Sequence, residues 1–170
     1  LNERCIAACR GGDRETVARL SARLLELLDD IDRLVAADAY FLLGKWIADA
    51  RSMGTTPAEK DYFEIDARNI LTTWGGRGYS LNDYANRTWS GLVSDYYKER
   101  WRRFYDRLQS GGEPDEDALL QELQDFEWEW VGRKGRFAER PRGDAFRLCR
   151  SLYTKYAAEI DRFYTEKTER

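Results

Sequence analysis

Carboxylates are the side chains in this sequence best able to perform acid–base chemistry, and they are abundant. Their spacing, however, does not place two of them together as a catalytic pair. Asp29 and Asp30 are adjacent, and Glu127 and Glu129 alternate, on segments of helical periodicity, so the members of each pair point away from each other. A general acid and a general base must face one reacting bond with separated pKa values. The sequence also contains no histidine, nucleophile motif or phosphate-binding loop. We therefore expect no catalytic residue in this chain.

The three cysteines do not indicate a metal site or a disulfide framework. Cys5, Cys9 and Cys149 are odd in number and include no CxxC pair. Cys5 and Cys9 have the spacing of one helix face, but no histidine is present to complete a metal site. We expect the cysteines to be small buried apolar residues, and we find no motif that predicts a metal or another cofactor.

A glycine-rich turn carries the residues most suited to bind a ligand. Trp74 and Tyr79 stand among Gly75, Gly76 and Gly78, between two segments rich in aromatic residues. Glycines permit positive φ angles and a close approach to the backbone. Indole and phenol rings suit the apolar faces and hydroxylated edges of sugars. Because Trp74 follows the expected end of a helix, its ring can project from the fold; the alternative is that it packs over the core beneath the turn.

Polar residues on either side of this turn have more ordinary interpretations. Asp83 and Asn86 either orient the turn or cap the next helix, and we favour capping. Arg68 and Asn69 precede Trp74 by about one helical turn and are placed to support it, although solvated helix faces explain such residues more often.

Two larger groups of residues also favour a structural interpretation over a binding one. A ladder of aromatic residues recurs at helical spacing, which indicates core packing rather than a carbohydrate platform. Its members are Trp89, Tyr96, Tyr97, Trp101, Phe104 and Tyr105. The basic residues between positions 133 and 142 are expected to form a solvated loop, with binding of a sulfated glycan as the alternative.

The elements that would position these residues are helices. Amphipathic periodicity predicts six of them, at about residues 14–36, 39–53, 57–73, 84–108, 115–131 and 144–167. Asp13 is expected to cap the first of these, and Thr56, Pro57 and Glu59 combine a capping box with a proline at the first helical position. Phe41, Leu42, Trp46, Ile47 and Ala50 are expected to face inward, and Gly111 and Gly112 to close the fourth helix.

The expected fold is therefore all-α, a bundle of about six mostly antiparallel helices that forms a single domain over residues 1–170. Residues 132–143 form the one long connection and could be mobile. The chain has 170 residues, of which 35% are charged and 42% hydrophobic, and its mean hydropathy is −0.73. These values and the lack of a long apolar run predict no membrane span. A net charge of −3 argues against nucleic acid as a partner.

Four ordered blocks of the sequence resemble the C-terminal helical domain of the alpha-N-acetylglucosaminidase family of glycoside hydrolases. They are FLLGKWIADAR (41–51), YFEIDARNILTTWG (62–75), DYANRTWSGLVSDYYKERW (83–101) and PRGD (141–144). The resemblance implies retaining hydrolysis of a terminal α-linked N-acetylglucosamine on a glycan. It also implies that the catalytic glutamates belong to a barrel domain upstream, so that this chain, which begins at Leu1, was cut from a longer protein and is inactive alone.

The same resemblance implies the binding residues. Trp74 and Tyr84 match positions that help to enclose the sugar in the family. Between them, Gly76-Arg77-Gly78 stands where family members often have Pro-Glu-Gly, which leaves the family's apolar contact to either Tyr79 or Leu81. By resemblance the parent protein is exported to the periplasm or outside the cell, or is lysosomal. The competing hypothesis is a helical module that binds a protein or glycan without catalysis.

Overall fold

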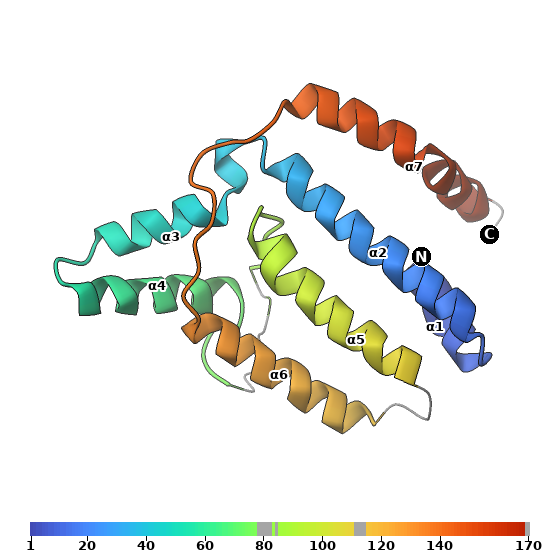
Figure 1. The fold of residues 1–170 in the computed structure, drawn as a ribbon, viewed down its shortest axis with the longest axis horizontal. Helices are drawn as coiled ribbons and strands as arrows, with labels where there is room; N and C mark the ends of the chain where they lie inside the picture. The colour runs from blue at the N-terminus through green and yellow to red at the C-terminus, as the bar shows by residue number, and fades with distance from the viewer. Residues whose placement is uncertain (78–82, 84, 111–114, 169–170) are drawn as a thin grey trace.

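The computed structural model describes residues 1–77, 83, 85–110 and 115–168, and every named element in them is helical (Figure 1). The α-helices of these residues are α1 (Asn2–Arg10), α2 (Arg14–Val35), α3 (Leu43–Ser52), α4 (Pro57–Leu71), α5 (Lys98–Ser110), α6 (Glu116–Gly132) and α7 (Ala145–Thr168). A short 3-10 helix, η1 (Ala39–Phe41), precedes α3, and a π-helical turn, η2 (Val93–Tyr97), runs directly into α5. No helix among the described residues is long and apolar enough to cross a membrane.

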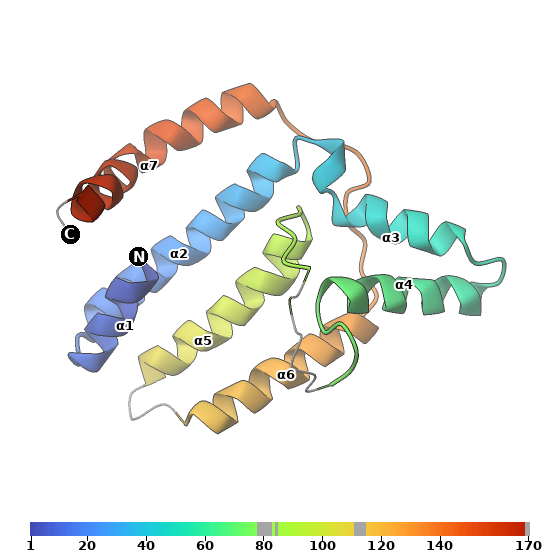
Figure 2. The ribbon, with the colours of Figure 1, turned by 180° about the vertical axis from the view of Figure 1, so that it is seen from behind.

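The long helices lie side by side in alternating directions. Helices α7, α2, α5 and α6 form a row in which each helix is antiparallel to its neighbour, and the α3–α4 hairpin projects from one end of that row (Figures 1 and 2). Helix α1 packs against α2 and α5. The expected all-α, mostly antiparallel bundle is therefore confirmed. The sequence pattern did not predict α1 as a separate helix.

Local capping signals set the starts of three helices, and two of these caps, at Asp13 and Thr56, were expected from the sequence. The Asp13 carboxylate accepts a hydrogen bond from the Thr16 amide at 3.0 Å and begins α2. Thr56 and Glu59 form the predicted capping box, with Pro57 at the start of α4. Asp115 caps α6 through the Ala118 amide. In each case the cap satisfies an amide that the first helical turn leaves without a partner.

The single helix predicted over residues 39–53 is wrong, because the chain is extended at Leu42. Leu42 has φ −116° and ψ 114° and separates η1 from α3. It lies opposite Ser90 in an isolated bridge: the Ser90 amide donates to the Phe41 carbonyl at 2.8 Å, and the Leu43 amide donates to the Ser90 carbonyl at 3.1 Å. Leu42 and Ile47 are buried as expected, whereas the Phe41 side chain is exposed.

The helix predicted over residues 84–108 is also shorter than expected at its start. Helical structure begins next to Val93, while residues 85–91 are not helical. The carboxylate that serves its first turn belongs to Asp32 of α2, which accepts hydrogen bonds from the amides of Gly91 and Ser94 at 2.7 and 3.1 Å. The predicted end at Gly111 and Gly112 lies outside the described residues.

Two apolar clusters hold the bundle together. The larger one joins α3, α4, η2 and α6 and contains Leu43, Ile47, Leu71, Leu92, Tyr96, Phe126, Trp130 and Val131. The smaller one joins α1, α2 and α5 and contains Cys5, Val17, Leu20 and Tyr105. The aromatic ladder is mostly core, as predicted, although Trp101 keeps 38% of its surface exposed. Cys5 is buried, but the prediction is wrong for Cys149, which is exposed because it lies on an outer face of α7.

Candidate functional site

Trp74 projects from the end of α4 rather than filling the core. The helix ends at Leu71, and the indole of Trp74 keeps 40% of its surface exposed. The residue has φ 61°, a left-handed conformation that is rare for a bulky side chain. Its amide donates to the Asn69 carbonyl at 2.7 Å, so the last turn of α4 fixes its position. The projection predicted from the sequence is confirmed, and Asn69 supports Trp74 through its backbone.

The described residues on the two sides of positions 78–82 are bonded to each other. We use the name 72–91 turn for the described residues 72–77, 83 and 85–91. The Asp83 amide donates to the Thr72 carbonyl at 2.7 Å, and this bond joins the two sides of the turn. Asp83 and Asn86 have φ angles of 59° and 42°, which their short polar side chains tolerate better than most. Thr72 and Thr73 are buried, so the base of the turn is part of the folded core.

The side chain of Asp83 binds an arginine instead of capping a helix. Its carboxylate forms an ion pair with Arg100 of α5, and the same guanidinium contacts Glu127 of α6 through Nε at 2.7 Å. Glu127 is almost completely buried. The prediction that Asp83 and Asn86 cap the fourth helix is wrong, because that helix begins several residues later and Asp32 serves its first turn. The alternative, orientation of the turn, describes Asp83.

A cavity of about 450 Å³ lies beside this ion pair. Asp83 and Asn86 of the 72–91 turn form one side of it, and the aromatic residues Trp101 and Phe104 of α5 form another. Trp74 is not among its lining residues. The cavity therefore combines polar groups with aromatic faces, the composition typical of small-ligand sites.

The two carboxylates around Arg100 do not form a catalytic pair. Asp83 and Glu127 contact one guanidinium, which occupies the space between them. Hydrolysis of a glycosidic bond instead requires the substrate to lie between two carboxyl groups roughly 5–9 Å apart. Burial raises the pKa of the Asp83 carboxyl, and the neighbouring Arg100 opposes that rise. Glu129 is exposed while Glu127 is buried, so the side chains of that pair diverge as predicted.

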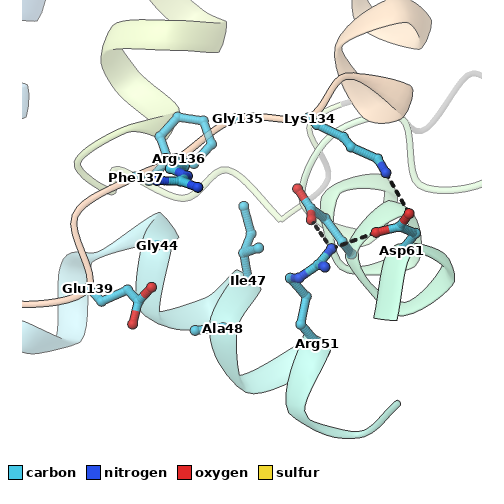
Figure 3. A pocket seen from close by; sticks show the side chains of 11 residues that line it. Gly44, Ile47, Ala48, Arg51, Asp61, Lys134, Gly135, Arg136, Phe137 and Glu139 are labelled. Atoms are coloured by element: carbon cyan, nitrogen blue, oxygen red, sulfur yellow. Dashed lines mark hydrogen bonds and ion pairs between the residues drawn. The ribbon is translucent and has the colours of Figure 1, made fainter. Parts of the chain in front are cut away.

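A second cavity, of about 740 Å³, lies between α3, α4 and the segment after α6 (Figure 3). Arg51 reaches across it to the carboxylates of Asp61 and Glu64 at 2.9 and 2.6 Å, and Lys134 also binds Asp61. Hydrogen bonds from Lys134 and Arg51 hold the pKa of Asp61 below its ordinary value. Asp61 is therefore ionised at neutral pH and is not suited to donate a proton to a substrate.

The basic connection 133–142 is anchored to the fold. Arg133 pairs with Asp95 of η2, and Lys134 pairs with Asp61 of α4. Phe137 packs against the larger core cluster, and the chain passes so close to α3 that a Cβ on Gly44 would lie 2.4 Å from the Ala138 carbonyl oxygen. The expectation of a solvated connection is confirmed for most of this segment, which is exposed, while Phe137 and Ala138 pack along α3.

The remaining predicted site residues cannot be placed. Tyr79, Leu81 and Tyr84 lie outside the described residues. Within the described part of the chain, no group of three or more cysteine, aspartate or glutamate side chains is arranged to hold a metal ion.

The family described as the alpha-N-acetylglucosaminidase (NAGLU) C-terminal domain matches residues 1–155. The chain belongs to this family. Human alpha-N-acetylglucosaminidase is 38% identical to it over 135 residues, which are 77% of this chain and 18% of the human protein. The chain therefore spans about a fifth of the length of that relative.

Part of a family 89 glycoside hydrolase from Clostridium perfringens has the same fold as this chain. The complex with 2-acetamido-1,2-dideoxynojirmycin has a TM-score of 0.79 and 32% identity, covering 93% of this chain and 19% of that one. A variant with two glutamate-to-glutamine substitutions, in complex with its substrate GlcNAc-alpha-1,4-galactose, has a TM-score of 0.77 and 32% identity, covering 91% and 18%.

Sequence reasoning missed the residues that anchor the 72–91 turn. The sequence pattern did not indicate a role for Arg100 or Asp32, because their partners are 17 and about 60 positions away in the chain. Arg68 was expected on a solvated face, yet it is buried and pairs with Glu64 at 2.9 Å. The only signal for Arg68 was its position four residues after Glu64, which places the two side chains on one helix face.

Proposed function

We propose that residues 1–170 are a single C-terminal domain of a longer alpha-N-acetylglucosaminidase-like enzyme, and that this domain forms part of its active-site wall. The enzyme hydrolyses a terminal α-linked N-acetylglucosamine with retention of configuration. The carboxylates that act as acid/base and nucleophile belong to a barrel domain upstream, which is the domain's main partner. Family membership supports this proposal. A second support is that Asp83 and Glu127, the carboxylates next to the 72–91 turn, bind Arg100 and do not face each other.

The observation that carries the proposal is the conformation of Trp74. A large apolar ring is kept half in solvent at a positive φ angle, at a cost in backbone strain, on a turn fixed at both ends. Such a ring offers an apolar surface that fits the C–H face of a pyranose. The similarity to a glycosidase solved with GlcNAc-alpha-1,4-galactose supports N-acetylglucosamine as the sugar that Trp74 meets.

The 72–91 turn contributes binding rather than bond cleavage. Trp74 and Tyr84 help to enclose the sugar, and Tyr79 or Leu81 supplies a further apolar contact. Enclosure excludes water and fixes the orientation of the ring relative to the catalytic carboxylates, and both effects lower the barrier to reaction. The 170-residue chain by itself is therefore inactive toward an aryl α-N-acetylglucosaminide.

Replacement of Trp74 in the complete enzyme tests this role. We expect Trp74→Ala to lower kcat/KM at least tenfold, equivalent to about 1.4 kcal/mol of transition-state stabilisation, without a change in thermal unfolding. Trp128→Ala is the matched control, because Trp128 on α6 is exposed to a similar extent, 42%. Unchanged kinetics for Trp74→Ala would remove this residue from the site, and an equal loss in both variants would attribute the effect to general disturbance.

A further inference from the structure

Three separate parts of the chain meet at the Arg100 side chain. Arg100 lies in the first turn of α5, directly after the π-helical turn η2. Its guanidinium binds Asp83 of the 72–91 turn on one side and Glu127 of α6 on the other. It also lies over the ring of Tyr96, with its central carbon 5.6 Å from the ring centroid. The turn is thus fastened to two helices of the bundle through one residue.

The surroundings of Arg100 make this contact firm. Its side chain is 27% exposed, Asp83 is 21% exposed, and Glu127 is 2% exposed. Water screens a pair of charges less when they are partly buried, so the attraction is stronger than in a surface pair. A planar guanidinium can also bind two carboxylates from fixed directions, which the point charge of a lysine does not reproduce.

The backbone of the turn connects this contact to Trp74. The Asp83 amide donates to the Thr72 carbonyl, and Trp74 follows two residues after Thr72. Because Arg100 holds the Asp83 side chain, it also restricts the backbone of Asp83. That backbone is hydrogen-bonded to Thr72, which lies two residues before Trp74. Trp74, Asp83 and Asn86 all have positive φ angles. Such conformations persist only where surrounding contacts determine them. The ion pair with Arg100 joins this turn to α5, the pair between Arg77 and Asp125 joins it to α6, and Asp32 joins it to α2.

We propose that Arg100 is a positioning residue: by holding Asp83 it keeps the 72–91 turn in the conformation that presents Trp74 to the sugar. The link to the sugar rests on the proposed function, whereas the hold on the turn does not. Arg100 lines the cavity of about 450 Å³ together with Asp83, and the proposed role requires no contact between Arg100 and the sugar. Its effect on the reaction passes through Asp83 and then Trp74.

Hydrogen exchange tests the hold on the turn directly in the 170-residue chain. In Arg100→Gln we expect the amides of Trp74 and Asp83 to exchange at least tenfold faster, measured by mass spectrometry on peptides that cover residues 72–91. Arg102→Gln is the control, because Arg102 lies on the same helix and pairs with Glu99 and Asp106 of its own helix. Exchange equal in the two variants overturns the proposal. Arg100→Lys keeps the charge and should exchange at an intermediate rate, which provides a second variant if Arg100→Gln does not fold.

Kinetics of the complete enzyme test the path through Trp74. We expect Arg100→Gln to lower kcat/KM at least tenfold in the natural background and less than threefold in a Trp74→Ala background. A purely structural role predicts the same loss in both backgrounds, and that result would overturn the positioning role. If exchange accelerates but neither Trp74→Ala nor Arg100→Gln changes kcat/KM, the hold on the turn stands and the proposed function fails.

Discussion

Arg68 and Arg100 are both arginines paired with glutamate against aromatic rings, yet their partners differ in kind. Arg68 pairs with Glu64 one turn earlier on the same helix, and its guanidinium lies 4.7 Å from the ring centroid of Trp130. Its side chain is 1% exposed. Arg100 is partly exposed, and both of its carboxylate partners come from other segments of the chain.

The comparison distinguishes an ion pair that stabilises the fold, that of Arg68, from one that orders the candidate site, that of Arg100. A pair four residues apart on one helix is held together by the helix itself, so little further chain entropy is lost when it forms. Arg68 therefore serves the core cluster around Trp130. A pair between a helix and a turn restricts residues that are otherwise free to move. Arg100 thus orders the turn, and its removal should affect function as well as stability, because the buried Glu127 loses this arginine.

The largest effect on stability is expected from Arg68→Ala. The change removes the guanidinium that lies against the rings of Trp130 and Phe137, and it leaves a cavity. It also removes one of the two arginines that pair with the buried Glu64. Breaking a buried charge pair from one side costs roughly 3–5 kcal/mol. Urea unfolding of the 170-residue chain measures this loss. The control is Lys45→Ala, which breaks an exposed pair with Asp49 at the same spacing and should cost less than about 0.5 kcal/mol. Similar values for the two variants would contradict the comparison.

The next effect is expected from Gly91→Ala, at the end of the 72–91 turn. Gly91 has φ 88°, and a Cβ there would lie 2.8 Å from Cδ1 of Phe137, the ring that also lies over Arg68. Positive φ costs about 1–2 kcal/mol for alanine, and overpacking costs about 1–3 kcal/mol. Gly76→Ala is the control, because a Cβ at Gly76 meets no atom within 4 Å. Equal melting temperatures would contradict both the backbone strain at residue 91 and the clash with Phe137.

A smaller effect on stability is expected from Asp83→Asn. Arg100 retains Glu127 after this change, and water reaches both Asp83 and Arg100, whose side chains are 21% and 27% exposed. We expect the free energy of unfolding to change by less than about 1 kcal/mol, as for partly exposed pairs, while exchange of the amide of residue 83 accelerates. A large loss of stability with unchanged exchange would place Asp83 with Arg68 as a fold-stabilising residue.

The smallest expected effect is the pH dependence of the difference in stability between Asp83→Asn and the unchanged chain. Burial raises the pKa of Asp83 in the folded chain above its value of 3.8 in the unfolded chain. The folded state then holds this proton to higher pH, so the contribution of Asp83 to stability falls as pH rises from about 4 through the raised pKa. Thermal unfolding between pH 4 and 7 should show Asp83→Asn gaining on the unchanged chain as pH rises. A gain in the opposite direction would mean that Arg100 outweighs burial.

Much of the fold was predictable because its signals are local. The start of α2 at Asp13, the capping box at Thr56 and the cap at Asp115 each depend on residues within four positions of one another. The amphipathic faces of α2 and α6 likewise repeat within a few turns. Such patterns can be recognised without knowledge of which helices pack together.

The errors lie where distant segments decide the structure. Helical periodicity continues through Leu42, but its bridge to Ser90 keeps the chain extended there. Asp83 and Asn86 have the composition of caps, yet Asp32 of another helix serves that role, and Asp83 binds Arg100. For the candidate site, the sequence predicted that Trp74 projects but gave no indication of what holds its turn. Contact of Trp74 with a sugar stays a prediction.

The carboxylate of Asp32 closes the far end of the 72–91 turn through bonds to Ser90, Gly91 and Ser94. Together with the bonds at Trp74 and Asp83 and the ion pair between Arg77 and Asp125 of α6, it joins the described residues of the turn to three helices of the bundle. Gly76 lies among these supports, and a Cβ there would meet no atom within 4 Å, so this position can be recomposed during evolution or engineering while the supports persist.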